Sequence, residues 1–391
     1  MVNNSRPSNP DFDIVISGGG CAGLSLAWHL YRHGPADQRI LLIDPEQSDE
    51  NPRTWCYWNQ PAVPFHHLRR KSWNHISVHT ADQNLSCKVG SIPGYHAIDS
   101  SRYREWIYED IAAHPYLKIS HTRTRPWQDS AEQVKITTDE GEISAGMLFQ
   151  NHHVNGNPYK TSRFGIRQHF IGWEIETDRE KFDPKSATFM DFRVDQTHGL
   201  AFMYVLPWSA QTALFEFTFF TPAVLDNEVY EKGIRTYLKD HYNLDDSDYR
   251  INRREQGVIP MIENLYSGGS KRVRPIGVIS GAAKPSSGYA FTRIQKQCRF
   301  YADQLKTKPL PDFYPPSARR FRTYDHILLR IIRNNPEIAI KAFENLFSKI
   351  PTSRLLHFLD EETKPSEELR ILNSVPRLRF LKAGIQELLR V

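Results

Sequence analysis

The chain has 391 residues, of which 39% are hydrophobic and 12% are aromatic, and its formal net charge is +5. This length suits roughly two or three domains, and the mild charge gives no reason to expect a nucleic-acid partner. The four cysteines show no C-x-x-C spacing, so we expect neither a metal site nor a disulfide framework, and a reducing cytosol is the natural setting. No run of about 18 apolar residues occurs, so no membrane-spanning helix is expected.

The first predicted elements form a βαβ unit near the start of the chain. Residues 1–11 are polar and are expected to form a disordered arm. Residues 12–17, FDIVIS, then predict a buried parallel strand, and residues 21–34 predict a helix with apolar side chains at helical spacing. Residues 39–44, RILLID, predict a second buried strand that ends in an acid. This order of elements is typical of a nucleotide-binding fold.

Glycines fill the turn between the first strand and the helix. Gly18, Gly20 and Gly23 match the pattern G-x-G-x-x-G, with Ala22 inside it. The first glycine permits a tight turn, the second lets a pyrophosphate approach the backbone, and the third lets helix and strand pack closely. The helix N-terminus presents N–H groups to the phosphates, and Asp44, 21 residues after Gly23, can accept the ribose hydroxyls. We therefore predict that these residues bind a dinucleotide.

The stretch that follows this unit favours FAD over NAD. Residues 51–58, NPRTWCYW, lead into a long non-helical insertion, which is not the layout of a simple two-domain dehydrogenase. Arg53 is expected either to pair with a flavin phosphate or to hold the loop beside the flavin ring, and the alternative is a surface arginine. Trp55, Tyr57 and Trp58 are expected to pack beneath this loop rather than to stack on a ligand.

The rest of the chain predicts a second sheet and then a series of helices. Residues 101–114 predict an amphipathic helix, and residues 132–150 alternate in polarity on both sides of a turn, which predicts a hairpin. Residues 167–220 contain several extended stretches that indicate a large antiparallel sheet. Residues 274–280, RPIGVIS, predict a strand that returns to the nucleotide sheet. From Phe321 onward the pattern is helical and is interrupted by prolines.

Several of these stretches, in this order, resemble the lycopene cyclases, which are flavoproteins that close the ends of linear carotenoids into rings. The resemblance runs from about Asp11 to Leu381 and is carried by DIVISGGGCAGLSLA, NPRTWCYW, QHFIGWEIE, MDFR, YVLPWSAQTALFEFTFF, EQGVIPM and GAAKPSSGYAF. It implies bound FAD that must be reduced although the reaction has no net redox change, with NAD(P)H as a candidate electron donor. It also implies a long polyene substrate, lycopene or a related linear carotenoid, and action at a membrane. The resemblance assigns functional residues of the family most clearly to Gly18, Gly20, Gly23, Asp44, Arg53, Glu216 and Gly288.

The predicted fold is α/β, with a Rossmann-like FAD-binding fold of the glutathione-reductase and hydroxylase type. An antiparallel β-sheet that binds substrate is inserted into it, and a helical C-terminal region follows. The expected FAD-binding domain is discontinuous and takes residues 12–60, 100–160 and 270–305. The expected substrate region takes residues 61–99 and 161–269, and the helical region takes residues 306–391.

Glu216 is the candidate catalytic residue. In ALFEFTFFT alternate side chains point to opposite faces of a strand, so the face of Glu216 is opposite to the face of Phe217. A carboxyl group buried among apolar side chains favours its neutral form, and its pKa rises. The alternative is a carboxylate at a strand end that is paired with an arginine.

A neutral carboxylic acid is what an alkene cyclisation requires. Protonation of the terminal double bond gives a tertiary carbocation, an internal double bond attacks it to close a six-membered ring, and loss of a ring proton ends the reaction. The cation needs nearby negative charge, aromatic faces and exclusion of water. Reduced flavin is the alternative proton donor, with Glu216 as its electrostatic partner, and the sequence is compatible with both assignments.

Two stretches depart from the pattern of the family. The family places a second acid directly after the glutamate matched by Glu216, but this chain has Phe217 there, which argues against a carboxylate pair. The stretch LFQNHHV, near Phe149, lacks the small residues and the arginine often found at that point in flavoproteins.

A second candidate cofactor contact lies shortly before a predicted helix near residue 292. In KPSSGYAF, the residues Pro285, Gly288 and Tyr289 precede that helix. Backbone N–H groups at a helix start can donate to the flavin pyrimidine, and the family resemblance implies the same contact.

The region from Arg293 to Arg333 is rich in basic residues. It carries ten Lys or Arg against three Asp, interleaved with aromatic and aliphatic residues. Such a segment can rest on an anionic bilayer or can form solvated helix faces, and a substrate that dissolves only in lipid favours the bilayer. We therefore expect a cytoplasmic protein that is peripherally associated with a membrane, and the sequence makes no prediction of its oligomeric state.

Two other functions compete with lycopene β-cyclase activity, which forms β-ionone rings. An FAD-dependent monooxygenase acting on an aromatic or isoprenoid substrate would normally carry a Gly-Asp pair before the second flavin-binding helix, and GVISGAAKP has none. A non-catalytic lipid-binding relative would keep only the nucleotide fold, an interpretation that Phe217 leaves open. The sequence does not distinguish closure of one end of the substrate from closure of both, nor one ring isomer from another.

Overall fold

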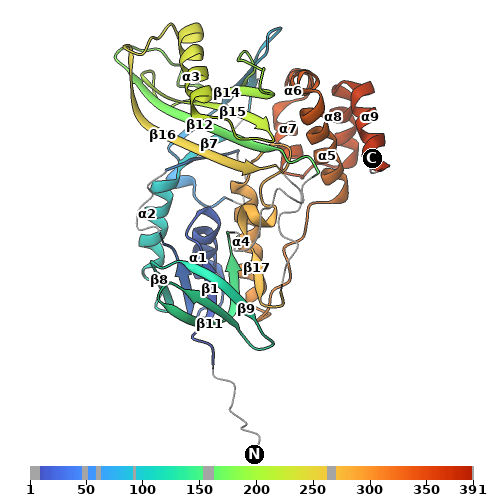
Figure 1. Cartoon of the computed structure of the whole chain (residues 1–391). Coiled ribbons are helices and arrows are strands. Elements are labelled where there is room, and N and C mark those ends of the chain that lie inside the picture. The colour runs from blue at the N-terminus through green and yellow to red at the C-terminus, as the bar shows by residue number, and fades with distance from the viewer. Residues whose placement is uncertain are drawn as a thin grey trace, which may run out of the picture.

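The computed structural model describes residues 9–45, 52–58, 63–90, 94–152, 163–261 and 270–389. Within these ranges the chain forms two large sheets, a small sheet and a group of C-terminal helices. Figure 1 shows the first sheet below the second, with the C-terminal helices beside the second sheet. Most of the arm expected at residues 1–11 lies outside the described residues, although the backbone N–H of Asp11 donates to Ser144 Oγ at 3.0 Å.

The first sheet contains the predicted βαβ unit. Its order is β8-β2-β1-β11-β10-β9, and β17 pairs with β11. The pairs β8–β2, β2–β1, β1–β11 and β11–β17 are parallel, whereas β10 is antiparallel to both of its neighbours. Buried aliphatic side chains on the central strands explain this arrangement, because a parallel sheet is covered on both faces. The strands are β1 (Phe12–Ser17), β2 (Ile40–Ile43), β8 (Leu117–Ser120), β9 (Thr124–Asp129), β10 (Val134–Thr138), β11 (Gly141–Gln150) and β17 (Val273–Pro275).

Helices α1 (Cys21–His33), α2 (Ser100–Ile111) and α4 (Phe291–Leu305) pack beside this sheet, and α1 contacts both of the others. The predicted helices and the hairpin of β10 and β11 are confirmed. The strand expected at residues 274–280 does join the sheet, but it ends at Pro275. Gly277–Ser280 form a 3₁₀ turn instead, because Gly277 adopts φ +71°, which ends the extended backbone.

The second sheet confirms the predicted large antiparallel sheet and adds two earlier strands to it. Its order is β16-β12-β15-β14-β13-β5-β6, and β13–β5 is its parallel pair. Helix α3 (Asn227–Tyr242) packs on β12 and β15, over the face that carries Phe215, Phe217 and Phe219. The strands are β5 (His75–His79), β6 (Asn84–Lys88), β12 (Arg167–Thr177), β13 (Ser186–Asp191), β14 (Leu200–Pro207), β15 (Thr212–Thr221) and β16 (Tyr249–Pro260).

A small sheet connects the two large ones. Its order is β3 (Thr54–Trp58), β7 (Tyr95–Asp99) and β4 (Lys71–Trp73), and a 3₁₀ turn at His66–Leu68 precedes β4. This sheet joins strands from two of the expected domains, so the domain bounds near residues 60 and 100 remain a prediction.

The C-terminal helices begin where the prolines indicate. Pro336 and Pro365 are the first residues of α6 (Pro336–Lys349) and α8 (Pro365–Ser374), because a proline at the first helical position loses no hydrogen bond. The other helices are α5 (Arg319–Asn334), α7 (Thr352–Leu359) and α9 (Arg377–Leu388). Helix α6 packs on β14, β5 and β6, and α9 packs on α5. No helix among the described residues is long and apolar enough to cross a membrane.

Candidate active site

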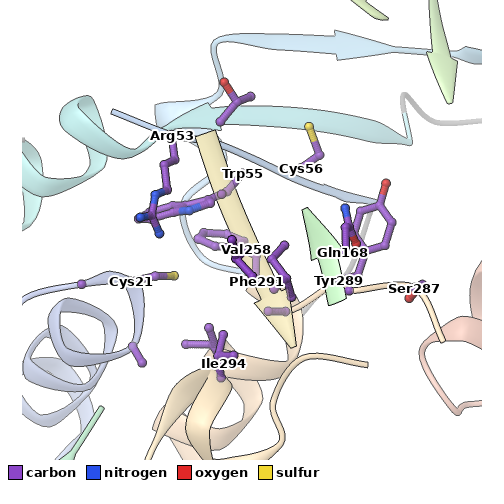
Figure 2. Close-up of a pocket in the computed structure, with 18 of the residues that line it drawn as sticks. Cys21, Arg53, Trp55, Cys56, Gln168, Val258, Ser287, Tyr289, Phe291 and Ile294 are labelled. Carbon is purple, nitrogen blue, oxygen red and sulfur yellow. The ribbon is translucent and has the colours of Figure 1, made fainter. Parts of the chain in front are cut away.

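A cavity of about 1070 Å³ lies where the first sheet, the second sheet and the C-terminal helices meet. Its wall includes the glycine turn at residues 18–20 of the first sheet, Glu216 of β15, and apolar side chains of α5–α7 such as Phe343 and Leu355. The wall therefore changes from bare backbone at one side to apolar side chains at another. Figure 2 shows part of this wall, with Cys21 at the start of α1 facing the start of α4.

Gly18, Gly19 and Gly23 of the glycine turn have no room for a side chain. Gly18 has φ +103°, and a Cβ atom there would lie 1.9 Å from Asn151 Oδ1. A Cβ atom on Gly23 would lie 1.8 Å from the carbonyl oxygen of Gly18, so the close helix–strand packing predicted at this position is present. Gly20 precedes α1, which has no side-chain cap, and Gly20 and Ala22 both line the cavity. The unpaired N–H groups of this helix start form a ready anion site.

Asp44 follows β2 and lines the cavity beside the glycine turn, as the motif predicts. Its carboxylate is buried and forms an ion pair with Arg104 of α2, with 2.5 Å between Oδ2 and Nη2, and it accepts a hydrogen bond from Tyr108. Arg104 also lines the cavity. Arg104 could not be recognised from the sequence because it lies within an ordinary amphipathic helix, and only the packing of α2 brings it to Asp44.

Asn151 and His152 are further cavity residues that were not predicted from the sequence. They follow β11, which is the parallel neighbour of β1. Asn151 Nδ2 donates to the Gly18 carbonyl at 2.9 Å and so supports the glycine turn. Both residues belong to LFQNHHV, the stretch that departs from the usual flavoprotein pattern. The signal that was available is that polar residues after a parallel strand lie at the ligand-binding edge of the sheet.

Arg53 and Trp55 line the cavity on the side of the small sheet. The backbone N–H of Arg53 donates to Ser100 Oγ at 2.7 Å, while its side chain is exposed, so an ion pair with phosphate remains a prediction. Trp55 stacks on Phe291 with 5.7 Å between ring centroids and also lines the cavity, so its expected packing role remains a prediction. Tyr57 is buried, as expected.

Gly288 and Tyr289 line the cavity near the start of α4, whereas Pro285 does not. Gly288 has φ +72°, and a Cβ atom there would lie 2.0 Å from Gln168 Oε1, so glycine is required. The N–H of Gly288 donates to the Lys284 carbonyl at 2.8 Å and is therefore engaged. The first turn of α4 has no side-chain cap, so its N–H groups are the ones placed to meet a ligand.

Two buried oxygen atoms in this part of the wall have no hydrogen-bond partner among the described residues. They are Gln168 Oε1 and Ser287 Oγ, and both residues line the cavity. Figure 2 shows Gln168 beside Tyr289. Because buried polar atoms are rarely left unpaired, these two indicate a bound polar group at this place.

Glu216 lies within β15 rather than at a strand end, and it faces Glu255 of β16. The two strands flank β12, and both glutamates are in register with Gly172 of β12. Both are buried, with exposed fractions of 9% for Glu216 and 3% for Glu255. The prediction from Phe217 that no carboxylate pair exists was therefore wrong, because the second acid comes from another strand. Phe217 packs towards α3, as strand alternation predicts.

The two carboxyl groups have different surroundings. Burial raises the pKa of Glu216 well above its usual range, and the charge of Glu255 and a hydrogen bond with it raise the pKa further. Burial also raises the pKa of Glu255, but its hydrogen bonds with Arg253 and Thr54 oppose that rise. Arg253 Nη1 lies 2.6 Å from Glu255 Oε2, so the anionic form of Glu255 is stabilised more than that of Glu216.

Aromatic side chains surround the cavity face of Glu216. Tyr289 stacks on Phe189 with 5.9 Å between centroids and hydrogen-bonds to Tyr95 at 2.5 Å, and Tyr95 bonds in turn to Tyr204. Burial raises the pKa of each of these tyrosines well above its usual range, so they remain neutral. This part of the cavity therefore offers aromatic faces without fixed charge.

Neither cysteine nor metal chemistry is indicated at this site. Burial raises the pKa of the Cys21 thiol to about 12, which is the behaviour of a packing residue rather than a nucleophile. No group of three or more His, Cys, Asp or Glu that could hold a metal ion occurs among the residues with described positions.

Comparisons of whole structures show the fold. A geranylgeranyl bacteriochlorophyll reductase-like protein from Thermoplasma acidophilum has a TM-score of 0.60 and 10% identity, and the match covers 97% of this chain and 98% of that one. A variant of the halogenase PltM in complex with FAD also has a TM-score of 0.60, with 11% identity and coverage of 92% and 85%. The chain thus has the predicted α/β architecture, with a Rossmann-type FAD-binding fold.

Sequence comparisons identify relatives whose names agree with one another. A lycopene beta-cyclase of Pantoea ananas is 26% identical over 299 residues, which cover 72% of this chain and 71% of the relative. A lycopene beta-cyclase of Pseudescherichia vulneris is 25% identical over 314 residues, with coverage of 76% and 75%. The family description "Lycopene cyclase protein" matches residues 13–384. This chain therefore belongs to the lycopene cyclase family of enzymes.

Proposed function

We propose that the protein is a lycopene β-cyclase that requires bound reduced FAD and closes the linear ends of lycopene into β-ionone rings. The observation that carries this proposal is the buried carboxyl group of Glu216, whose pKa burial raises, beside the aromatic side chains Phe189, Tyr204 and Tyr289 of the cavity wall. The ring type follows the names of the relatives. The acid supplies what the chemistry of an alkene needs, and no redox change of the substrate is involved.

The side of the cavity near the first sheet fits FAD. The glycine turn leaves the start of α1 open to a diphosphate, and Asp44 with Arg104 stands where a ribose would lie. The unpaired oxygens of Gln168 and Ser287 and the uncapped start of α4 suit the polar edge of a flavin ring. Bound reduced flavin would supply negative charge close to a carbocation.

Glu216 is the proposed proton donor. Its O–H bond breaks as a C–H bond forms at the terminal alkene carbon, and the tertiary cation that results is attacked by the internal double bond. The carboxylate that remains can accept the proton that the ring then loses, so the residue ends in its original state. The aromatic side chains Phe189, Tyr204 and Tyr289 exclude water and face the cation.

Expression in cells that accumulate lycopene tests this proposal. Cells carrying the chain should convert lycopene into cyclised carotenoid, whereas cells with an empty vector should not. Unchanged pigment with NADPH oxidation by the purified flavoprotein would favour a monooxygenase instead. Unchanged pigment without turnover would favour a lipid-binding relative, and either result would overturn the proposal.

We also propose that the protein associates with membranes, but not through the basic region predicted from sequence. Most cations of that region already have carboxylate partners, which come from the region itself, from the turn after α7, and from α8 and α9. The ion pairs are Arg293–Glu361, Lys296–Glu362, Arg299–Asp303, Lys306–Asp303, Lys308–Asp312, Arg320–Glu368 and Arg330–Glu387. The positive charge available to a bilayer is therefore much smaller than the sequence count indicates.

A better candidate is the apolar face of α8 and α9, which we call the C-terminal face. Its leucines and isoleucine lie at helical spacing, and Leu378 is 84% exposed. Exposed cations on the same helices complement an anionic bilayer. Helix α9 packs on α5, whose neighbours α6 and α7 line the apolar side of the cavity, so a polyene would have a short path from lipid. The apolar members are Leu369, Leu372, Leu378, Leu381, Ile385, Leu388 and Leu389, and the cations are Arg370, Arg377, Arg379 and Lys382.

A further inference from the structure

We propose that Glu255 and Gly172 are positioning residues that keep Glu216 in its neutral, proton-donating form. In this arrangement Glu216 holds the single proton of the pair, and Glu255 holds the negative charge. The catalytic consequence rests on the proposed function, whereas the location of the proton can be measured without substrate.

The first support is the gap that Gly172 leaves between the two acids. A Cβ atom on Gly172 would lie 2.8 Å from Glu216 Cγ and 3.1 Å from Glu255 Cγ. Side chains on neighbouring strands normally stand beside a side chain of the strand between them. Here the middle strand has none, so the two carboxyl groups can meet across it. Glycine in the interior of a strand often marks such a close approach.

The second support is the asymmetry of the charges behind the pair. Arg253 is fixed by the Pro52 carbonyl at 2.9 Å, Thr54 Oγ1 at 2.9 Å and Glu174 Oε2 at 3.1 Å. From this position it binds Glu255, which also accepts from Thr54 Oγ1 at 3.1 Å. These donors stabilise the anionic form of Glu255. Glu216 faces the cavity, and no cation among the described residues forms an ion pair with it.

The other titratable groups that face Glu216 are neutral. Cys56 of the small sheet, Tyr204 of β14 and Tyr289 before α4 all have pKa values that burial raises. The charged groups that act on Glu216 are therefore Glu255 and Arg253. Two like-charged carboxylates this close cannot both ionise readily, so the pair retains one proton over a wide pH range.

This arrangement serves both proton transfers of the proposed reaction. Before ring closure, the negative charge on Glu255 keeps the proton on Glu216. After Glu216 has released it, two adjacent carboxylates repel each other, which makes Glu216 a stronger base for the proton that the ring must lose. A raised pKa thus brings the acid and base roles of one residue closer to neutral pH.

The test is the pH dependence of ring closure by the flavin-loaded protein. Glu255→Gln removes the negative charge and leaves Arg253 in place, so Glu216 should ionise more easily. The alkaline limb of the profile should move to lower pH by at least about one unit, and activity should recover in acid. Glu255→Asp keeps the charge and should retain more of the wild-type profile. Glu176→Gln, which removes a half-buried acid of β12 that pairs with Arg250 outside the cavity, is the matched control and should leave the profile unchanged.

Gly172→Ala tests the geometry separately. The added methyl group forces the carboxyl groups apart, and a displacement near 1 Å can lower the rate about 10²-fold. Because the separation weakens the influence of Glu255, the alkaline limb should move in the same direction as in Glu255→Gln. A merely structural defect would lower the rate without moving the profile, and that result would contradict the role of Gly172.

Infrared difference spectroscopy locates the proton without substrate. The carboxyl C=O band of a protonated acid should be present at neutral pH in the wild type, absent in Glu216→Gln, and shifted to a lower titration midpoint in Glu255→Gln. An unchanged midpoint in Glu255→Gln would overturn the inference even if the protein is a cyclase. A shifted midpoint in a protein that forms no cyclised product would instead overturn the proposed function and leave the proton assignment intact.

Discussion

The two working parts of the cavity are assembled in different ways. The nucleotide part comes from one continuous βαβ unit, in which the glycine turn and Asp44 follow neighbouring parallel strands. The carboxylate part comes from Gly172, Glu216 and Glu255, which are distant in sequence and meet only through the register of β12, β15 and β16. The first part is specified by local backbone geometry, and the second is specified by strand pairing.

This difference implies that binding and chemistry can be separated by substitution. A change at the glycine turn should remove the cofactor, and ring closure should fall as a consequence. A change at the carboxylate pair should leave the cofactor bound and stop the reaction directly. If both changes produced the same loss of flavin, the division into a binding part and a reacting part would be wrong.

The largest expected effect is at Glu216. Glu216→Gln keeps the shape of the side chain but removes the transferable proton, so ring closure should fall by about 10²–10⁴-fold. Flavin content and the thermal unfolding transition should persist, which separates this loss from misfolding. Conversion of lycopene at the wild-type rate would show that the flavin or another residue donates the proton.

In the nucleotide part of the cavity, the substitution that corresponds to Glu216→Gln is Gly20→Glu. The nearest atom to a Cβ at Gly20 is 3.8 Å away, so a side chain fits, and an acid at a helix start does not disturb the fold. The added charge should repel the diphosphate and weaken FAD binding by about 10²-fold or more. Gly20→Gln adds similar bulk without charge and should weaken binding less. Titration of the apoprotein with FAD measures both, and equal affinities would contradict an anion site here.

A smaller effect is expected far from both parts, at the C-terminal face. Replacing Leu378, Leu381 and Ile385 by serine should reduce binding to anionic vesicles by at least about tenfold, because each apolar side chain loses its transfer energy into lipid. Val224→Ser, another exposed apolar position, is the control. Flotation with vesicles measures the effect. A change from dimer to monomer with unaltered flotation would show that the face binds a second copy of the chain.

The smallest expected effect is on the pH dependence of the melting temperature. It arises from Glu216 and therefore belongs to the carboxylate part of the cavity. The folded-state pKa of Glu216 lies above its ordinary value of 4.5, so its contribution to stability is complete below that value and is lost as the pH rises through the folded pKa. Glu216→Gln does not titrate. Its melting temperature relative to the wild type should therefore increase by a few degrees as the pH rises. A constant difference across the range would contradict the raised pKa.

The nucleotide part could be predicted because its signal is local. A strand, a turn without side chains, a helix and a terminal acid occur within residues 12–44, and each follows from short-range geometry. Asn151 and Arg104 escaped prediction because they reach the same place from a later strand and from α2. Only the order of the sheet and the packing of α2 bring them to the turn.

The carboxylate pair could not be predicted, because adjacency in the sequence differs from adjacency in a sheet. Position 217 was the expected place for a second acid, yet alternation turns Phe217 towards α3. The acid beside Glu216 is instead Glu255, which lies two strands away in the sheet. It can be found only when the pairing of both strands with Gly172 of β12 is known. The ion pairing of the basic region was only partly visible for the same reason, because Glu361, Glu362 and Glu368 reach it from later in the chain.

Isotope incorporation during ring closure tests the central claim most directly. Flavin-loaded, reduced protein would be incubated with lycopene in vesicles prepared in D₂O, and the product would be examined by mass spectrometry. In a single turnover, an exchangeable carboxyl proton that starts the reaction leaves one deuterium in the newly closed ring, and Glu216→Gln forms no such product under the same conditions. A cyclised product without deuterium, or with an equal yield from Glu216→Gln, would contradict protonation by Glu216.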